Sequence, residues 1–141
     1  MNLHDGVWIT GGVDRWGRKT RRTQFVHPDG TVEGGPNLPK ARDRHCMVNL
    51  NDGRVMIIGG HPTLYTVTVY HHSNNSFDRA PYLQYGRYNH ACAVFNSPLH
   101  GNRPVVLVTG GASTGNRGYK TEVLDYTNPS AEWEESEYYL M

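Results

Sequence analysis

The sequence predicts an all-β fold built from one small antiparallel sheet that recurs about three times. Three apolar runs, VWIT at 7–10, VMII at 55–58 and VLVT at 106–109, each end in a glycine pair. An apolar run rich in β-branched residues and stopped by Gly-Gly is typical of a buried strand that ends in a sharp turn. The runs recur at intervals of 48 and 51 residues, which indicates a repeat architecture. Sixteen glycines and eight prolines in 141 residues also favour a turn-rich β protein over a helical bundle.

The remaining strands follow from apolar segments bounded by turn residues. In the first unit, a charged loop through residue 22 separates the 7–10 strand from a second strand at 23–27. The turn Pro28-Asp29-Gly30 then leads to a short third strand at 31–33. The second unit is predicted to form strands at 46–50, 55–58, 65–70 and 76–78, with a strong hairpin signal at Asn51-Asp52-Gly53. The third unit repeats this plan with strands at 91–95, 105–109, 122–126 and 132–134.

The units keep a common register, so they are copies of one element. Two positions seven residues apart recur in each unit, occupied by the pairs Phe25 and Val32, Tyr70 and Phe77, and Tyr126 and Trp133. The main difference in length is a longer loop at 96–103 in the third unit, where insertions are tolerated. We therefore divide the chain into an incomplete three-stranded unit at 1–41 and two four-stranded units at 42–86 and 87–141.

These motifs resemble the kelch repeat family. The resemblance rests on the Arg-x-x-His pairs Arg42/His45 and Arg87/His90, the three glycine pairs, Tyr70, Tyr126 and Trp133. It implies a kelch-type β-propeller, whose four-stranded antiparallel blades run from an innermost strand a to an outermost strand d. The first unit lacks strand a, so the chain would hold about two and three-quarter blades.

A partial propeller of this size leaves apolar blade faces uncovered. Propellers typically close with roughly four to eight blades. We therefore expect the chain to be a segment of a longer protein that supplies the remaining blades, with self-association as the weaker alternative.

The two cysteines, Cys46 and Cys92, lie in the strands that precede a glycine-pair strand. Alignment of the units on His45 and His90 places the thiols one register position apart, so they should point to opposite faces of their own strands. We therefore expect two small buried apolar groups, and neither a disulfide nor a metal pair.

Strand order alone predicts where the charge gathers. In an antiparallel meander the b–c loops (roughly 13–22, 61–64 and 112–120) and the d–a connections (roughly 39–44 and 84–89) lie at one end of the blades. They hold eleven of the fourteen basic residues, and only Asp14 and Asp43 oppose them. Most other acids, Glu135 among them, fall toward the other end or the outer strand. This basic end is therefore expected to attract an acidic partner.

Candidate ligand-binding residues are the arginines, lysines and aromatic residues of these loops, because arginine captures carboxylates and aromatic residues anchor interfaces. They are Arg15, Trp16, Arg18, Lys19, Arg21, Arg22, Arg44, Tyr85, Tyr88, Arg117, Tyr119 and Lys120. The alternative for the 15–22 run is a solvated loop. Arg42 and Arg87 are repeat-equivalent, which favours a structural role for them at least as much as ligand contact.

No motif for catalysis, a cofactor or a metal emerges from the sequence. His45 and His90 are repeat-equivalent and are expected to build the blades, and the other histidines show no metal-ligand spacing. The Gly110–Gly115 segment follows a strand but does not open a helix, so it lacks the usual geometry for binding phosphate. The net charge of +1 and the short apolar runs argue against nucleic-acid and membrane partners.

The sequence thus predicts a non-catalytic protein-interaction module for a protein or peptide ligand, with an acidic one favoured. The kelch resemblance further implies substrate recognition in a ubiquitin ligase adaptor, or actin binding. The alternative is a galactose-oxidase-like copper enzyme, which needs tyrosines, histidines and a cross-linked cysteine; no such set can be placed on Cys46 or Cys92. Residues 1–5 do not form a signal peptide, and the compartment stays open with the cytoplasm favoured.

Overall fold

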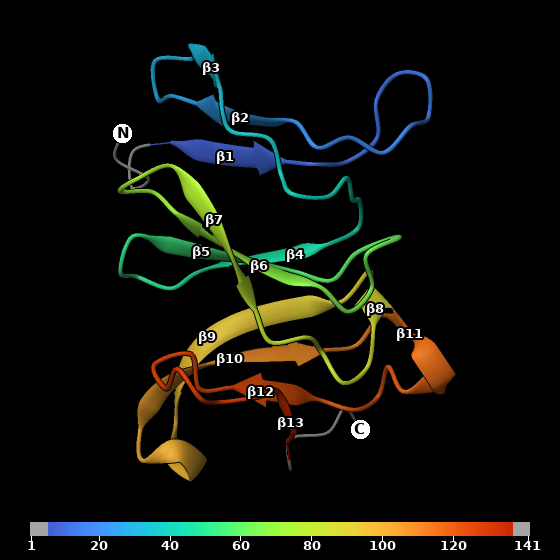
Figure 1. Cartoon of the computed structure of the whole chain (residues 1–141), viewed down its shortest axis with the longest axis vertical. Helices are drawn as coiled ribbons and strands as arrows, with labels where there is room; N and C mark the ends of the chain where they lie inside the picture. Colours follow the sequence, from blue (N-terminus) through green and yellow to red (C-terminus); the bar gives the residue numbers. More distant parts are fainter. Residues whose placement is uncertain (1–5, 137–141) are drawn as a thin grey trace.

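The computed structural model describes residues 6–136 and shows three antiparallel sheets stacked in chain order along the long axis of the molecule (Figure 1). The first sheet is three-stranded, with the order β1-β2-β3: β1 (Val7–Thr10), β2 (Thr23–Val26) and β3 (Val32–Gly34). The second is four-stranded, with the order β4-β5-β6-β7: β4 (Cys46–Asn49), β5 (Arg54–Ile58), β6 (Val67–His71) and β7 (Ser76–Ala80).

The third sheet is also four-stranded, with the order β9-β10-β12-β13: β9 (Ala91–Ser97), β10 (Arg103–Thr109), β12 (Glu122–Leu124) and β13 (Glu134–Glu135). A two-stranded ribbon of β8 (Arg87–Tyr88) and β11 (Ala112–Ser113) and two short 3-10 turns, η2 (Pro98–His100) and η3 (Thr114–Asn116), complete this part of the chain. The predicted all-β class with four-stranded antiparallel sheets is confirmed, and the three sheets are called the first, second and third blade below. The last strand begins at Glu134, two residues later than the sequence pattern predicts.

The apolar core lies between the blades, because strand side chains alternate between the two faces of a sheet. In β5, Val55 and Ile57 pack toward the first blade, in a cluster with Trp8, Phe25, Leu38 and Tyr70. Met56 and Ile58 face the third blade, in a cluster with Val48, Leu50, Val67, Val69, Leu83, Val106, Val108, Leu124 and Trp133. The second blade is therefore covered on both faces, which explains its nearly continuous apolar strands.

The far face of the first blade is different. The side chains of Val7 and Ile9 on β1, and of Val32 on β3, are largely exposed. Among the described residues they have no neighbouring sheet, because β1 buries only its alternate residues against the second blade. No helix in residues 6–136 is long and apolar enough to cross a membrane.

The prediction that the cysteines stay unpaired is wrong. Cys46 of β4 and Cys92 of β9 form a disulfide, with their Cα atoms 6.1 Å apart. Their one-register offset does turn them to opposite faces of their own strands. Stacked blades, however, present opposite faces to each other, so the offset brings the two thiols together between the second and third blades. The disulfide therefore joins the innermost strands of neighbouring blades.

A backbone clasp joins consecutive blades at the glycine pairs. The N–H of Gly12 donates to the carbonyl oxygen of Arg42 at 2.8 Å, and the N–H of Gly60 donates to that of Arg87 at 3.0 Å. The preceding residue also has to be glycine: a Cβ at Gly11 would lie 2.5 Å from the Arg42 oxygen, and the φ of Gly11 is +59°. A larger residue would clash there and would strain the left-handed backbone. The first two glycine pairs thus each fix the arginine that begins the next blade.

The two repeat-equivalent histidines complete this clasp, in the structural role that the sequence predicts. The Nε2 atom of His45 lies 2.8 Å from the Thr10 hydroxyl, and that of His90 lies 3.0 Å from the Ile58 carbonyl oxygen. Each histidine therefore reaches back to the end of the glycine-pair strand in the preceding blade. Burial, together with the nearby Arg42 or Arg87, lowers the pKa of both histidines to about 4.

Reduction of the disulfide is expected to destabilise the fold. Replacing Cys46 and Cys92 with alanine, or adding a reductant, should lower the free energy of unfolding by about 2–4 kcal/mol, because the unfolded chain loses a cross-link. Urea unfolding with and without dithiothreitol measures this change. The double alanine variant is the control, since it should not respond to the reductant; a wild-type midpoint that is equally insensitive would contradict the disulfide.

Stability is also expected to fall as the pH decreases from about 6.5 to 4. In this window the unfolded histidines bind protons while folded His45 and His90 do not, so each adds a slope of up to about 1.4 kcal/mol per pH unit. Urea unfolding across this range should show a smaller slope in His45→Gln and His90→Gln than in the wild type. An equal slope in all three proteins would contradict buried neutral histidines.

Candidate ligand-binding end of the blades

The b–c loops and d–a connections lie at one end of the stack, on the right in Figure 1. Strands β1, β5 and β10 all run toward this end, and the β8–β11 ribbon lies there as well (Figure 1). Every predicted ligand-binding residue belongs to this end. Their contacts divide them into three groups, and the groups differ in how much of their positive charge is already paired.

The first group surrounds an exposed tryptophan on the loop between β1 and β2. The Trp16 side chain is 64% exposed, and the guanidinium carbons of Arg15 and Arg18 lie 4.1 and 4.9 Å from the centre of its ring. A cleft of about 640 Å³ opens beside it. The cleft is lined by Ile9, Gly11, Asp14, Trp16, Arg18, Lys19, Thr20, Arg21, Arg22, Thr23, Gln24, Asn37 and Ala41. Positive and aromatic side chains thus lie together beside a cleft in this group.

Asp14 shapes this loop and pairs part of its charge. Its carboxylate accepts hydrogen bonds from the backbone N–H groups of Arg18 and Trp16, both at 2.9 Å, and from Arg18 Nε at 3.0 Å. The bonds from Arg18 and Trp16 lower the pKa of Asp14, so it stays ionised. Arg15 and Arg22 have no carboxylate partner among residues 6–136 and remain available for a ligand.

Lys19 and Arg21 are held by the chain that enters the second blade. Lys19 Nζ lies 3.8 Å from Asp43 Oδ1, and Arg21 Nε donates to the Leu38 carbonyl oxygen at 2.6 Å. The side chains of these two residues therefore help to fix the loop, although both line the cleft.

The second group is Arg44 and Tyr88. The Arg44 guanidinium carbon lies 4.7 Å from the centre of the Tyr88 ring, and Arg44 Nε lies 3.1 Å from Asp43 Oδ2. The single carboxylate of Asp43 thus contacts both Lys19 and Arg44, so it lowers the net positive charge between the first two groups.

The third group holds Tyr85, Arg117, Tyr119 and Lys120, and it includes an acid that the sequence analysis placed elsewhere. Lys120 Nζ lies 2.5 Å from Glu135 Oε1, and the Tyr85 hydroxyl donates to Glu135 Oε2 at 3.1 Å. Arg117 Nη1 donates to the Tyr119 hydroxyl at 3.2 Å. Glu135 lies on the outer strand as expected, but its side chain reaches the basic end and neutralises Lys120 there. Pairing of β12 with β13, which sets Glu135 opposite Glu122, is the signal that could have located it.

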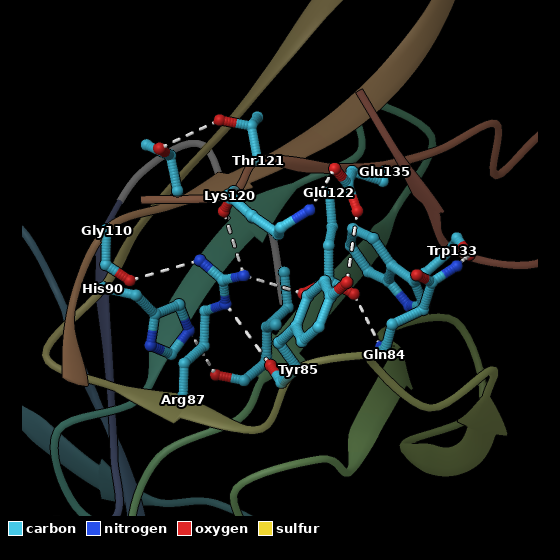
Figure 2. A network of polar contacts seen from close by, with 12 residues as sticks. Gln84, Tyr85, Arg87, His90, Gly110, Lys120, Thr121, Glu122, Trp133 and Glu135 are labelled. Atoms are coloured by element: carbon cyan, nitrogen blue, oxygen red, sulfur yellow. Dashed lines mark hydrogen bonds and ion pairs between the residues drawn. The ribbon is translucent and has the colours of Figure 1, made fainter. Parts of the chain in front are cut away.

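Arg87 is buried and forms an ion pair with Glu122, which the sequence analysis missed (Figure 2). Its Nη2 atom lies 2.9 Å from Glu122 Oε2, and its guanidinium also donates to the carbonyl oxygens of Gly110 and Lys120 at 3.2 and 3.1 Å. The other oxygen of Glu122 accepts from the backbone N–H of Gln84 at 2.6 Å. Burial raises the pKa of Glu122, and the contacts with Gln84 and Arg87 oppose that shift. Figure 2 shows these groups converging around the Arg87 guanidinium.

Comparison with known proteins places the fold. Neither protein-family models nor curated proteins contain a match to this sequence. The solved structure of YjhT matches with a TM-score of 0.71 and 16% sequence identity, over 96% of this chain and 50% of that chain. The chain therefore has the fold of half a kelch propeller. It spans about half the length of YjhT, and at this identity the likeness concerns the fold alone.

Removal of the negative charge of Glu122 is expected to destabilise the third blade strongly. Glu122→Gln should lower the free energy of unfolding by about 3–5 kcal/mol, because a buried arginine loses its carboxylate. Glu134→Gln on the adjacent strand is the matched control; its ion pair with His100 is exposed, and its loss should cost about 1 kcal/mol or less. Urea unfolding of both variants measures the difference, and equal stabilities would contradict the buried pair.

Proposed function

We propose that this chain is a non-catalytic interaction module that binds an acidic segment of a protein or peptide at the basic end of its blades. The observation that carries the proposal is the exposed Trp16, with Arg15 and Arg18 over its ring beside a basic cleft. Tryptophan and arginine are the residues most often found at the energetic centre of protein interfaces. A guanidinium also binds carboxylates in a bidentate way.

The distribution of charge supports an acidic ligand. Arg15 and Arg22 lack a carboxylate partner among the described residues, whereas Arg18, Lys19, Arg44 and Lys120 each have one. The first blade thus offers two arginines without a carboxylate partner, whereas in the third-blade group Lys120 is paired and, among the described residues, Arg117 contacts the Tyr119 hydroxyl. A ligand should therefore dock mainly on the loop between β1 and β2.

The kelch-type fold extends the proposal to the biological context. Recognition of a ubiquitin ligase substrate and binding of actin are both roles of this class for such a surface. The remaining blades would come from the rest of a longer protein or from a second copy of the chain. The Cys46–Cys92 disulfide favours an oxidising compartment over the cytoplasm that the sequence favours, and so supports an acidic ligand in such a compartment over these two cytoplasmic roles.

No feature of the described residues favours the copper-oxidase alternative. That chemistry needs a cysteine cross-linked to another side chain, and Cys46 and Cys92 are bonded to each other. Among residues 6–136, moreover, no cluster of three or more histidine, cysteine, aspartate or glutamate side chains is arranged to hold a metal ion.

A charge-reversal experiment tests the proposed function. The probe is a fluorescein-labelled peptide of alternating glutamate and alanine, measured by anisotropy, with the glutamine peptide as its uncharged counterpart. Arg15→Glu with Arg22→Glu should weaken binding of the glutamate peptide at least tenfold at low salt, because two attractive contacts become repulsive.

The matched control is Arg54→Glu with Arg103→Glu, which changes the net charge equally at residues outside the basic end. This control should leave the affinity within about twofold, and added salt should weaken binding to the wild type. Equal losses in the two double variants, or equal binding of the glutamine peptide, would refute the proposal.

A further inference from the structure

The second blade repeats the buried arginine of the third blade but not its acid. Arg42 and Arg87 both begin a blade and both offer their carbonyl oxygens to a glycine pair. Tyr70 and Tyr126 are also equivalent, and the residue four positions before them is Thr66 in the second blade but Glu122 in the third. The ion pair of the third blade therefore has no counterpart within the second.

Neighbouring positions also differ between the two blades. Pro39 stands in place of Gln84, which gives its backbone N–H to Glu122, and Lys40 stands in place of Tyr85, whose hydroxyl donates to Glu135. The outer strand of the third blade sets Glu135 opposite Glu122, whereas that of the second blade sets Arg79 opposite Thr68. The second blade thus has neither acid in this region and has two additional cations, Lys40 and Arg79.

Arg42 is left as a buried cation with incomplete contacts. Its side chain is 1% exposed, and its donors reach only the Gly59 carbonyl oxygen at 3.1 Å and the carbonyl and hydroxyl oxygens of Thr66 at 3.4 and 3.2 Å. Its Nε has no hydrogen-bond partner in the described structure. Burial without an acid lowers the pKa of Arg42 to about 10. A buried charge of this kind is costly until a counter-charge satisfies it.

A cleft of about 300 Å³ lies against this arginine. It is lined by Pro39, Lys40, Arg42, Thr66, Val67, Thr68, Phe77, Asp78, Arg79 and Tyr82. The one acid in this lining is Asp78, which lies between Phe77 and Arg79 on β7. Its Oδ2 atom lies 2.8 Å from His71 Nε2. Neither Lys40 nor Arg79 forms an ion pair within residues 6–136, so three cations border a space in which the one carboxylate, that of Asp78, lies against His71.

We propose that this cleft in the second blade binds a carboxylate ligand. The carboxylate would contact Arg42 with Lys40 and Arg79, in the place that Glu122 occupies in the third blade. The site is separate from the Trp16 cluster, and the inference does not depend on the proposed function. A side-chain carboxylate of a bound peptide and a small free carboxylate share this chemistry.

The Arg42 Nε–H resonance reports on the site directly. The full chain, labelled with ¹⁵N-arginine, is titrated with N-acetylglutamate amide, with N-acetylglutamine amide as the uncharged probe and with inorganic phosphate. We expect a saturable shift of the Arg42 resonance with the glutamate compound and none with the glutamine compound. A tripeptide with a central glutamate and neutral ends, if it binds at least tenfold more tightly, identifies a peptide as the source; equal affinity identifies a small carboxylate.

Substitutions in the second blade test whether the carboxylate replaces the missing acid. Thr66→Glu should supply that acid internally, raise the unfolding temperature and abolish the ligand-induced shift. The double variant Lys40→Gln with Arg79→Gln removes two exposed cations without altering the core. Each of its two substitutions should weaken binding of the glutamate compound about two- to fivefold. Arg54→Gln with Arg103→Gln is the matched control and should leave the affinity unchanged.

Three outcomes would overturn the inference. The first is a shift of the Arg42 resonance that does not saturate, and the second is an equal response to the glutamine compound. The third is a titration that is unaltered both in Thr66→Glu and in Lys40→Gln with Arg79→Gln. A response to phosphate alone would likewise reject a carboxylate site. Arg15→Glu with Arg22→Glu should leave this titration unchanged, so the proposed function and this inference can fail separately.

Discussion

The architecture depends on one backbone interaction, in which a glycine N–H of one blade donates to the carbonyl oxygen of the arginine that begins the next. Gly12 and Gly60 make this bond at 2.8 and 3.0 Å. The chain must approach so closely at Gly11 that any side chain would collide with the Arg42 oxygen. This requirement explains why a glycine pair ends the second strand position in both the first and the second unit while the sequences of the loops around it differ.

The clasp has a second consequence, because it forces the arginine side chain into the blade. A buried guanidinium needs a counter-charge or a dense set of carbonyl groups. The third blade provides Glu122, whereas the second blade provides only neutral oxygens. One repeated structural element therefore yields a satisfied ion pair in one blade and an electrostatically incomplete cleft in the next. The first blade carries its unpaired positive charge elsewhere, on the exposed loop around Trp16.

The sequence predicts the scaffold well because its signals are local. Apolar alternation and glycine pairs define the strands, and their antiparallel order alone sends the basic loops to one end. The register of His45 and His90 likewise predicts a shared structural role, which their contacts with Thr10 and Ile58 confirm.

The features that the sequence analysis missed depend on how separate strands meet in space. Opposite strand faces seemed to separate Cys46 from Cys92, but the stacking of blades turns those faces toward each other. Glu122 and Glu135 reach their partners from the two outer strands of the third blade, across positions far apart in the sequence. The partner that a long side chain reaches from an outer strand depends on how the strands are arranged in the folded sheet, so no local sequence pattern predicts it.

Hydrogen exchange at the two clasp amides tests this account most directly. If the clasp holds the blades together, the N–H groups of Gly12 and Gly60 open only with global unfolding and are protected as strongly as the amides of β5. Exchange at the rate of exposed amides in the loop around Trp16 would show that the blades are held together by other contacts.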